Sequence, residues 1–199
     1  MSNKFYELFG GSIYQSASSK LGFSVVHRKL LALIPKKEHL NILDVGCGTG
    51  KMLSHMASTF PASELSGVDL STSMIRFAKK KYPNISFTVG DAENLPIENE
   101  SFEVVTNSIS FHHYHYPQKA VDEAYRVLKS GGQFLLVDIS PRKPKVLDFL
   151  TTHFVRDGHV GFITPNNMRS MFEKAGFENI VQHKTGIPTI WITVGYKIS

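Results

Sequence analysis

Three glycines at alternate positions, Gly46, Gly48 and Gly50, form the segment of this sequence most able to hold a ligand. Glycine lets the backbone turn sharply from a strand into a helix, and it lets a ligand approach without a Cβ in the way. The spacing G-x-G-x-G differs from the dinucleotide pattern G-x-G-x-x-G, and Met52 stands where a phosphate loop has serine or threonine. The segment therefore predicts a binding turn that is neither of these two nucleotide-phosphate loops.

Two aspartates follow later strand-like segments, each where a strand is expected to end. Asp69 comes 19 residues after Gly50, where a carboxylate can accept hydrogen bonds from the hydroxyls of a ribose. Asp91 ends the next strand-like segment, where an acid can meet the amino group of an adenine. Either aspartate alone is more often a helix cap or a turn residue. Both together beside a glycine loop favour the binding of a nucleoside.

A cluster of aromatic and histidine side chains occupies residues 111–116. Histidine titrates near neutral pH and often acts as a general base. Three interpretations stay open for this cluster: packing against a ligand, transfer of a proton, and binding of a metal ion. The cluster has no cysteine partner and no fixed acidic ligand nearby, so we predict no metal site. His112 and His115 are the candidates for proton transfer.

Short strands that alternate with helices must position these residues. Strand patterns are predicted at 41–45, 64–70, 85–89, 102–108, 133–139, 178–184 and 190–198, and helix patterns at 23–34, 51–60, 72–82, 118–129, 146–156 and 165–175. This order predicts an α/β fold, a doubly wound and mostly parallel sheet of seven strands with helices on both faces. The short last connection makes the C-terminal pair antiparallel. In such sheets, ligands bind beyond the carboxyl ends of the strands.

Length and composition bound the class of protein. The chain has 199 residues, 42% of them hydrophobic and 20% charged, which suits one globular domain. A single cysteine excludes an intrachain disulfide and a multi-cysteine zinc site. The sequence shows no apolar run near the roughly 20 residues of a membrane span and no secretory pattern, so we expect a cytoplasmic protein. The net charge of +5 is modest, and the lysines at 79–81 are expected at a helix end.

The motifs occur together in an order that resembles the class I S-adenosylmethionine-dependent methyltransferases. The matching segments are ILDVGCGTG at 42–50, VDLS at 68–71, GDAENLP at 90–96, SFEVVTNSISFHH at 101–113, AYRVLKSGGQFLLVD at 124–138 and AGFENI at 175–180. Within that family the chain is most similar to the methyltransferase type 11 group, which includes ubiquinone and menaquinone C-methyltransferases. The resemblance implies a Rossmann-like doubly wound sheet, with S-adenosylmethionine as cofactor and S-adenosylhomocysteine as product.

The resemblance also implies which residues bind the cofactor: Asp44, Gly46, Cys47, Gly48, Gly50, Asp69, Leu70, Met74, Asp91, Ala92, Asn107 and Ser108. The backbone of the three glycines would contact the methionine part. Asp44 would support the loop and orient the amino group of the cofactor. Asn107 and Ser108 would lie beside the methionyl and sulfonium part. Cys47 lies between the loop glycines, and we interpret its thiol as a small packing group and not as a nucleophile.

The remaining implied contacts surround the nucleoside. Asp69 would hold the ribose hydroxyls, and Leu70 would flank the adenine. Asp91 and Ala92 would lie at the adenine edge. Met74 is a candidate neighbour of the adenine, although a buried helix methionine is the commoner outcome for such a position.

The expected function is transfer of the methyl group of S-adenosylmethionine to a small-molecule acceptor by in-line displacement. The domain is expected to span 1–199, with an N-terminal helical lid at 1–38 and a substrate-side insertion at 141–164. The alternatives are a methyltransferase for tRNA or another macromolecule, and a non-catalytic regulatory subunit that binds the cofactor. The absence of an appended RNA-binding module disfavours a nucleic-acid partner. The glycine spacing disfavours a nicotinamide-dependent dehydrogenase. The sequence does not indicate the acceptor or the oligomeric state.

Overall fold

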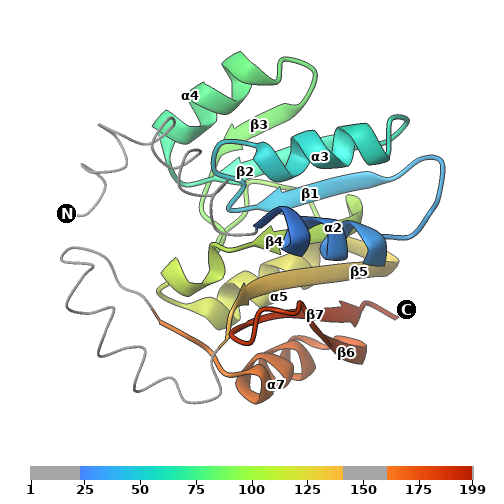
Figure 1. Cartoon of the computed structure of the whole chain (residues 1–199), viewed down its shortest axis with the longest axis vertical. Helices are drawn as coiled ribbons and strands as arrows, with labels where there is room; N and C mark the ends of the chain where they lie inside the picture. The colour runs from blue at the N-terminus through green and yellow to red at the C-terminus, as the bar shows by residue number, and fades with distance from the viewer. Residues whose placement is uncertain (1–22, 141–160, 199) are drawn as a thin grey trace.

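The computed structural model of the chain describes residues 23–140 and 161–198. In this part of the chain one sheet holds seven strands in the order β3-β2-β1-β4-β5-β7-β6 (Figure 1). The strands are β1 (Asn41–Val45), β2 (Glu64–Asp69), β3 (Ser86–Val89), β4 (Phe102–Ser108), β5 (Leu128–Ile139), β6 (Glu178–Lys184) and β7 (Ile190–Tyr196).

Five neighbouring strands are joined by parallel pairing. β1 pairs with β2 and β4, β2 pairs with β3, and β4 pairs with β5, all in parallel register. β7 runs antiparallel to both β5 and β6. The predicted fold class is therefore confirmed. The chain builds the sheet outward from β1 through β2 to β3, then crosses to the other side of β1 to add β4 and β5, so β1 and β4 flank the topological switch point.

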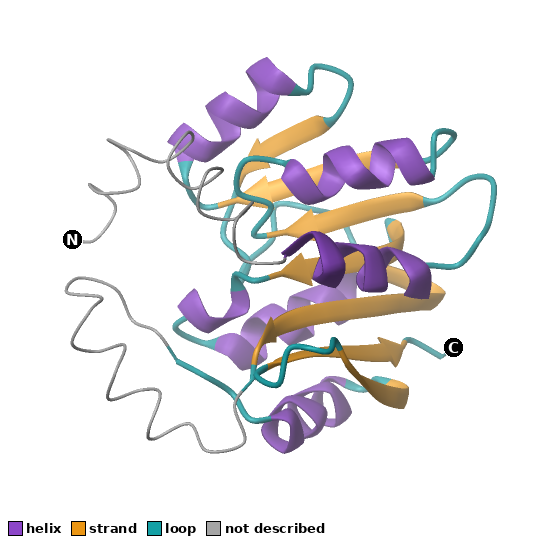
Figure 2. Cartoon of the chain, viewed as in Figure 1, coloured by secondary structure: helices purple, strands orange, loops and turns teal. Residues whose placement is uncertain are grey.

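Helices cover both faces of the sheet (Figure 2). They are α2 (Phe23–Leu33), α3 (Lys51–Thr59) and α4 (Thr72–Lys81) on one face, and α5 (Pro117–Val127) and α7 (Pro165–Ala175) on the other. Successive strand residues point to opposite faces, so Ile42 and Val104 join the first core cluster while Leu43 and Val105 join the second. The central strands are buried on both faces, which explains their almost continuous apolar sequence.

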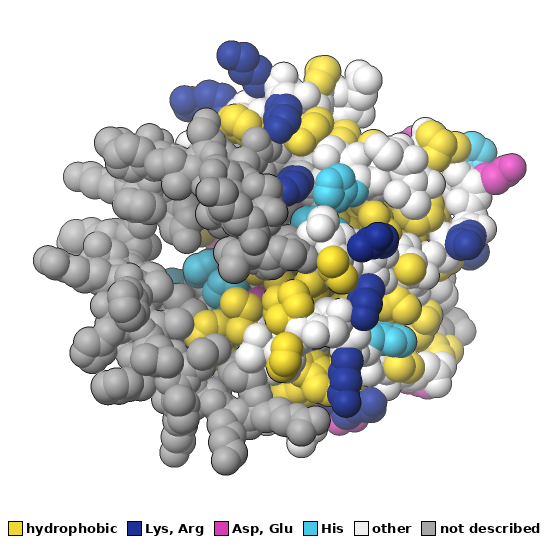
Figure 3. Space-filling view, in the orientation of Figure 1, with side chains coloured by type: hydrophobic (Ala, Val, Ile, Leu, Met, Phe, Trp, Pro, Cys, Tyr) yellow, Lys and Arg dark blue, Asp and Glu magenta, His cyan; other side chains and the backbone are white. Residues whose placement is uncertain are grey.

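The ends of the helices follow local signals in the sequence. The side chain of Ser71 accepts a hydrogen bond from the backbone N–H of Met74 and caps α4, whose last turn carries the three lysines at 79–81. There the lysines complement the helix dipole, as the sequence predicts. Thr164 caps α7 in the same way, and Gly176 ends that helix with a φ of 98°. Figure 3 shows lysine and arginine side chains at several separate places on one face of the molecule.

One predicted helix end is wrong. The pattern at 118–129 predicts a helix ended by Gly131 and Gly132, but α5 stops at Val127 and β5 begins at Leu128. Leu128 pairs with Phe102 of β4, so tertiary pairing takes the last two residues from the helix. Gly131, at a φ of 77°, donates its N–H to the carbonyl of Lys197 at 2.8 Å inside the sheet. The helix predicted at 146–156 lies outside the described residues.

Substitution of Phe172 by alanine is expected to lower the free energy of unfolding by about 3–5 kcal/mol, because the side chain is fully buried. Its ring stacks on Phe134 of β5 with ring centroids 5.1 Å apart, and it also contacts Phe177. The stack with Phe134 joins α7 to β5. Urea unfolding measures the loss. Val181 of β6 is 47% exposed, so Val181→Ala is the control and should change the value by less than about 1 kcal/mol. Equal losses in the two variants would contradict the expectation.

Within residues 23–140 and 161–198, no helix is long and apolar enough to cross a lipid bilayer.

Candidate functional site

The glycine segment connects the carboxyl end of β1 to the start of α3. All three glycines have positive φ, 69° at Gly46, 52° at Gly48 and 75° at Gly50, a backbone region that side chains with a Cβ rarely adopt. The N–H groups of Gly46 and Cys47 both donate to the carbonyl of Val68, at 2.7 and 3.1 Å. The loop is thus fastened to β2 at the edge of the sheet where the sequence predicts a ligand.

The carboxylate of Asp69 holds the loop and the start of α4 together. Its Oδ2 accepts the N–H of Gly48 at 2.8 Å, and its Oδ1 accepts the N–H of Ser71 at 2.9 Å. Burial raises the pKa of Asp69 above its ordinary value, against the lowering effect of these two hydrogen bonds. Each carboxylate oxygen has a second lone pair, so the group can accept further hydrogen bonds from a ligand.

A polar cluster lies beneath the first glycine of the loop. Asn107, the partner of Val45 across β1 and β4, donates from Nδ2 to the Val45 carbonyl at 2.8 Å and to the hydroxyl of Tyr114 at 2.7 Å. Within the described residues, the buried Oδ1 of Asn107 and Oγ of Ser108 have no hydrogen-bond partner. Unpaired buried polar atoms are rare because they lose hydration without compensation. Their place at the switch point marks them as groups that a ligand can satisfy.

Asp44 is the most deeply buried carboxyl of the site, with 1% of its surface exposed. The hydroxyl of Thr106 on β4 donates to its Oδ1 at 2.7 Å. Burial raises the pKa of Asp44 to about 7; the Thr106 hydrogen bond lowers it, and the negative charge of Asp69 raises it further. This carboxyl therefore changes its charge near neutral pH.

The raised pKa of Asp44 makes the stability depend on pH. The unfolded chain releases this proton near pH 4, whereas the folded chain keeps it to about pH 7. Between these values the folded state binds more protons, so the free energy of unfolding falls as the pH rises. Relative to Asp44→Asn, which keeps the acceptor for Thr106, the native chain should lose about 3 kcal/mol between pH 4.5 and 7.5 in urea unfolding. Parallel pH profiles for the two proteins would contradict this.

His112 lies in the 3-10 helix Phe111–His113, directly after β4, and Asp138 near the end of β5 holds it at two points. The Oδ2 of Asp138 accepts the backbone N–H of His112 at 2.8 Å, and its Oδ1 lies 2.7 Å from the ring Nδ1. The carboxylate is 2% exposed. His115, the second predicted candidate, is exposed. The structure thus gives His112 a buried carboxylate partner.

Four polar residues of this edge are not singled out by the sequence. Thr106 contacts Asp44, Ser110 and Tyr114 lie beneath Gly46, and Asp138 holds His112. Asp138 gives one signal, since it is an acid within the apolar run of β5, at the end of a central strand. Tyr114 stands among the aromatic residues of 111–116 without any spacing that distinguishes it. Burial raises its pKa above the ordinary value.

The other residues that are predicted to contact the cofactor differ in how deeply their side chains are buried. Leu70, at the tip of β2, is 62% exposed, whereas Met74 is buried at 5%. Asp91 is exposed, and its Oδ1 accepts the N–H of Glu93 in a turn, which fits the turn interpretation as well as an adenine contact. Ala92 packs its side chain into the second core cluster.

Cys47 packs its side chain into the first core cluster, as the sequence predicts for a small packing residue. Burial raises the pKa of the thiol well above its ordinary value, so the thiolate needed for a nucleophile is disfavoured. Only the backbone of Cys47 is left to face a ligand. Of the two predicted substrate-side segments, residues 1–22 and 141–160 lie outside the described residues, and α2 packs on the first face of the sheet through Val26 and Leu30.

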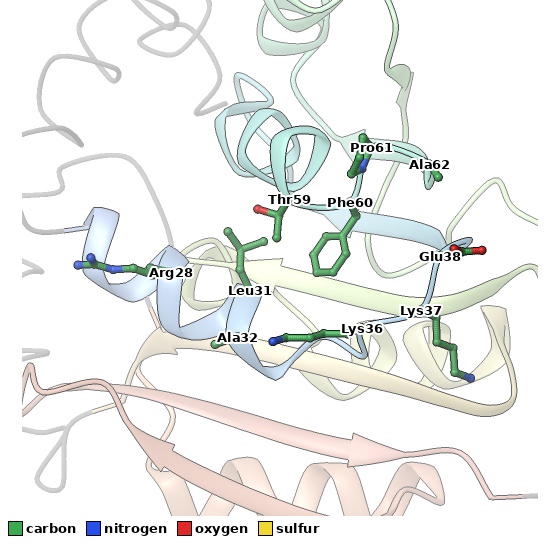
Figure 4. A pocket seen from close by; sticks show the side chains of 10 residues that line it. All are labelled: Arg28, Leu31, Ala32, Lys36, Lys37, Glu38, Thr59, Phe60, Pro61 and Ala62. Carbon is green, nitrogen blue, oxygen red and sulfur yellow. The ribbon is translucent and has the colours of Figure 1, made fainter.

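A hollow of about 610 Å³ lies away from this edge, between α2 and the end of α3 (Figure 4). Its walls include Leu31 and Phe60, and Lys36 and Lys37 line it near the start of β1. The amino end of β1 lies here, so the hollow is remote from the glycine loop and from His112. We place the functional site at the carboxyl edge, where the acids and unpaired polar atoms gather.

A comparison with protein families finds that residues 43–136 match a model described as "Methyltransferase domain". Demethylmenaquinone methyltransferase of Chlorobaculum parvum is 34% identical over 131 residues, which cover 65% of this chain and 54% of the relative. Phthiotriol/phenolphthiotriol dimycocerosates methyltransferase of Mycobacterium tuberculosis is 38% identical over 102 residues, 50% of this chain and 38% of the relative. The chain thus spans about half the length, or less, of these curated relatives.

A solved structure from Thermotoga maritima, described as an S-adenosylmethionine-dependent methyltransferase and possible histamine N-methyltransferase, has the same fold. It superposes with a TM-score of 0.77 at 21% identity, over 96% of this chain and 97% of the other. The matched residues 43–136 run from β1 into β5 and include the glycine loop, Asp69, Asn107 and His112. Residues 43–136 of the chain thus match the methyltransferase domain family, and the chain has the fold of a solved S-adenosylmethionine-dependent methyltransferase.

Proposed function

We propose that this chain binds S-adenosylmethionine at the carboxyl edge of the sheet and transfers its methyl group to a small-molecule acceptor. The observation that carries the proposal is the group of unsatisfied acceptors beside the glycine loop, at the switch point between β1 and β4. Asn107 Oδ1 and Ser108 Oγ are buried without partners among the described residues. At Gly48, a Cβ would have no described atom within 4 Å, so the backbone is open to a ligand on that side.

The chemistry of these groups fits the cofactor. S-adenosylmethionine carries an ammonium and a sulfonium, and the loop brings two carboxyl groups, Asp44 and Asp69, close to its backbone. A bound cation would favour the ionised forms of these carboxyls, which burial alone disfavours. Asp69 supports a ribose contact because its oxygens keep lone pairs beyond their bonds to Gly48 and Ser71.

In the proposed reaction, the protein binds the cofactor, aligns the acceptor with its methyl group and removes a proton from the acceptor. When bound, the cofactor supplies a methyl group on a positively charged sulfur, which is already a strong electrophile. Alignment of the acceptor and exclusion of water then supply most of the remaining catalysis. Removal of a proton from the acceptor is assigned to the histidine cluster, with His112 and His115 as the candidates.

The two curated relatives support an acceptor of low molecular weight. Their names give demethylmenaquinone and phthiotriol or phenolphthiotriol dimycocerosates as what those proteins methylate. Each of these is a small molecule or a lipid. The acceptor of this chain is proposed at that level only, as a small organic molecule.

Two measurements test the proposal. S-adenosylmethionine and S-adenosylhomocysteine should raise the melting temperature, because a ligand that binds only the folded state stabilises it, and NADH should not. A labelled-methyl assay with a metabolite extract and, separately, with total RNA should label the extract. Stabilisation by NADH alone would overturn the proposed cofactor. Labelled RNA would overturn the small acceptor, and cofactor binding without any labelling would indicate a non-catalytic subunit.

A further inference from the structure

The hollow between α2 and the end of α3 has apolar walls. Leu31 and Ala32 come from α2, and Phe60, Pro61 and Ala62 come from the chain that follows α3. In Figure 4 the side chains of Leu31 and Phe60 approach each other from the two sides of the hollow. The volume of about 610 Å³ lies within the range of about 300–1,000 Å³ that is usual for small-molecule pockets. The hollow is therefore large enough for an apolar group of limited size.

Three cations line the same hollow: Arg28, Lys36 and Lys37. Arg28 precedes the two apolar lining residues of α2 by three and four positions, so it shares a face of the helix with them. The two lysines follow Pro35, whose carbonyl accepts the N–H of Lys37 at 3.0 Å in a turn after the helix. The positive charge thus lies on the side of the hollow that α2 and this turn form.

The charge of these cations is not balanced locally. Among the residues that the structure describes, none of the three has a carboxylate oxygen within 4 Å, whereas Lys197 lies 3.2 Å from Glu100. Glu38 is the one acid among the lining residues, and in Figure 4 its side chain and that of Lys36 extend in opposite directions. The lining residues therefore carry a net positive charge, and an anion is complementary to them.

We propose that this hollow binds a small amphiphile that carries one carboxylate on an apolar chain. The carboxylate would lie against Arg28 and Lys36, because a guanidinium donates two parallel hydrogen bonds to a carboxylate and an ammonium adds a point charge. The apolar chain would lie between Leu31 and Phe60, where it leaves water. Glu38 disfavours a doubly charged head group such as a phosphate. The proposal does not depend on the methyl transfer, since the hollow is remote from the glycine loop.

The recessed position of the apolar atoms favours a single molecule over a lipid bilayer. Phe60 is 8% exposed and Leu31 is half-buried, so both lie below the surface around them. Binding to a bilayer takes apolar side chains that protrude and enter the lipid. Burial of Phe60 also disfavours a single-stranded nucleic acid, whose bases stack on the exposed faces of aromatic rings.

Decanoate is the probe for the class of ligand, and decan-1-ol and decyltrimethylammonium keep its chain with a neutral or a cationic head group. Calorimetric titration of the full chain should show one site for decanoate, about 10-fold or more weaker binding of the alcohol, and no binding of the cation. Octanoate lacks two methylenes and should bind about 4- to 15-fold more weakly than decanoate. No binding of decanoate, or equal affinities for decanoate and decan-1-ol, would overturn the proposal.

Two double variants test the cations. Arg28→Gln combined with Lys36→Gln removes two charges from the hollow and should weaken the binding of decanoate about 10-fold or more. The matched control, Arg76→Gln combined with Lys80→Gln, removes the same two charges from α4 and should keep the native affinity. All four side chains are exposed, so the melting temperature should change by only a few degrees in either protein. Equal losses of affinity in the two double variants would overturn the assigned contacts.

Backbone NMR locates the probe without reference to its affinity. Decanoate should shift the amide signals of residues 28–38 and 59–62 and leave those of 44–50 in place. Shifts at 44–50 that S-adenosylhomocysteine reverses would place the probe at the glycine loop and overturn the proposal, while the proposed function would stand.

The same titrations distinguish other occupants of the hollow. Phosphatidylglycerol vesicles and a single-stranded oligothymidylate stand for a bilayer and a nucleic acid. A chain that binds either of them but not decanoate, and loses that binding in the double variant of Arg28 and Lys36, would overturn the proposal. A decanoate affinity that falls as the protein concentration rises would assign the hollow to a contact between two copies of the chain and would also overturn it. One decanoate site at 28–38 and 59–62, weakened only by the loss of Arg28 and Lys36, supports the proposal.

Discussion

Replacement of Asp69 by alanine is expected to weaken the binding of S-adenosylmethionine about 100-fold, from the loss of charge-assisted hydrogen bonds worth about 1.5–3 kcal/mol each. The carboxylate ends β2, and its two oxygens already accept the N–H groups of Gly48 and Ser71. Its remaining lone pairs are the acceptors that we propose for the ribose hydroxyls. Isothermal titration with S-adenosylmethionine and S-adenosylhomocysteine measures the change.

In Asp69→Ala, the loss of unfolding free energy should be much smaller than the loss of binding free energy for the cofactor. Burial raises the pKa of Asp69, so the folded protein holds this charge against a desolvation penalty. Alanine removes that penalty together with the two hydrogen bonds, and the two effects oppose each other. Asp122→Ala, on the exposed side of α5, is the control and should change neither quantity. A variant of Asp69 that loses stability but binds the cofactor with native affinity would show that the carboxylate only supports the loop.

The fold could be predicted closely because its signals are local and repeated. Ser71 before α4, Thr164 before α7 and the glycine after α7 each mark a helix end by the chemistry of one residue. The central strands are almost continuously apolar, which is the pattern of strands in a sheet that is buried on both faces. The boundary at Val127 and Leu128 could not be predicted in this way, because it is set by pairing with Phe102, a residue far away in the sequence.

The site could be predicted as an edge of the sheet but not as a set of contacts. The glycine segment and Asp69 lie near each other in the sequence pattern, and the structure joins Gly48 to Asp69 at 2.8 Å. Asp138 and His112 are separated by 26 residues, and nothing in either segment indicates that β5 brings its acid beneath the turn that follows β4. Such contacts arise from parallel pairing between strands, whose register depends on the whole core.

Replacement of Gly46 by alanine is expected to lower the free energy of unfolding by about 3–5 kcal/mol, the sum of backbone strain and overpacking. Its φ is 69°, and an added Cβ would lie 2.2 Å from the Oγ of Ser110 and 2.7 Å from the hydroxyl of Tyr114. Urea unfolding measures the loss. Ser110→Ala removes the nearest atom, so the double variant should recover part of the stability. No recovery in the double variant would mean that the strain at φ, and not the contact with Ser110, sets the loss.

A comparison of Gly48→Ala with Gly131→Ala separates backbone strain from the loss of cofactor binding at the glycine loop. Gly48 and Gly131 have positive φ of 52° and 77°, and at both an added Cβ would have no described atom within 4 Å. Alanine at either position therefore strains the backbone alike, at about 1–2 kcal/mol of unfolding free energy. Only Gly48 lies in the loop that we propose for the cofactor, whereas Gly131 lies in β5 beside Lys197. Gly48→Ala should weaken the binding of S-adenosylmethionine at least 10-fold, and Gly131→Ala should leave it unchanged. If titrations gave the two variants equal affinities for S-adenosylmethionine, the glycine loop would not belong to the binding site. Both variants are expected to lose the same unfolding free energy, so a difference in stability could not account for that result.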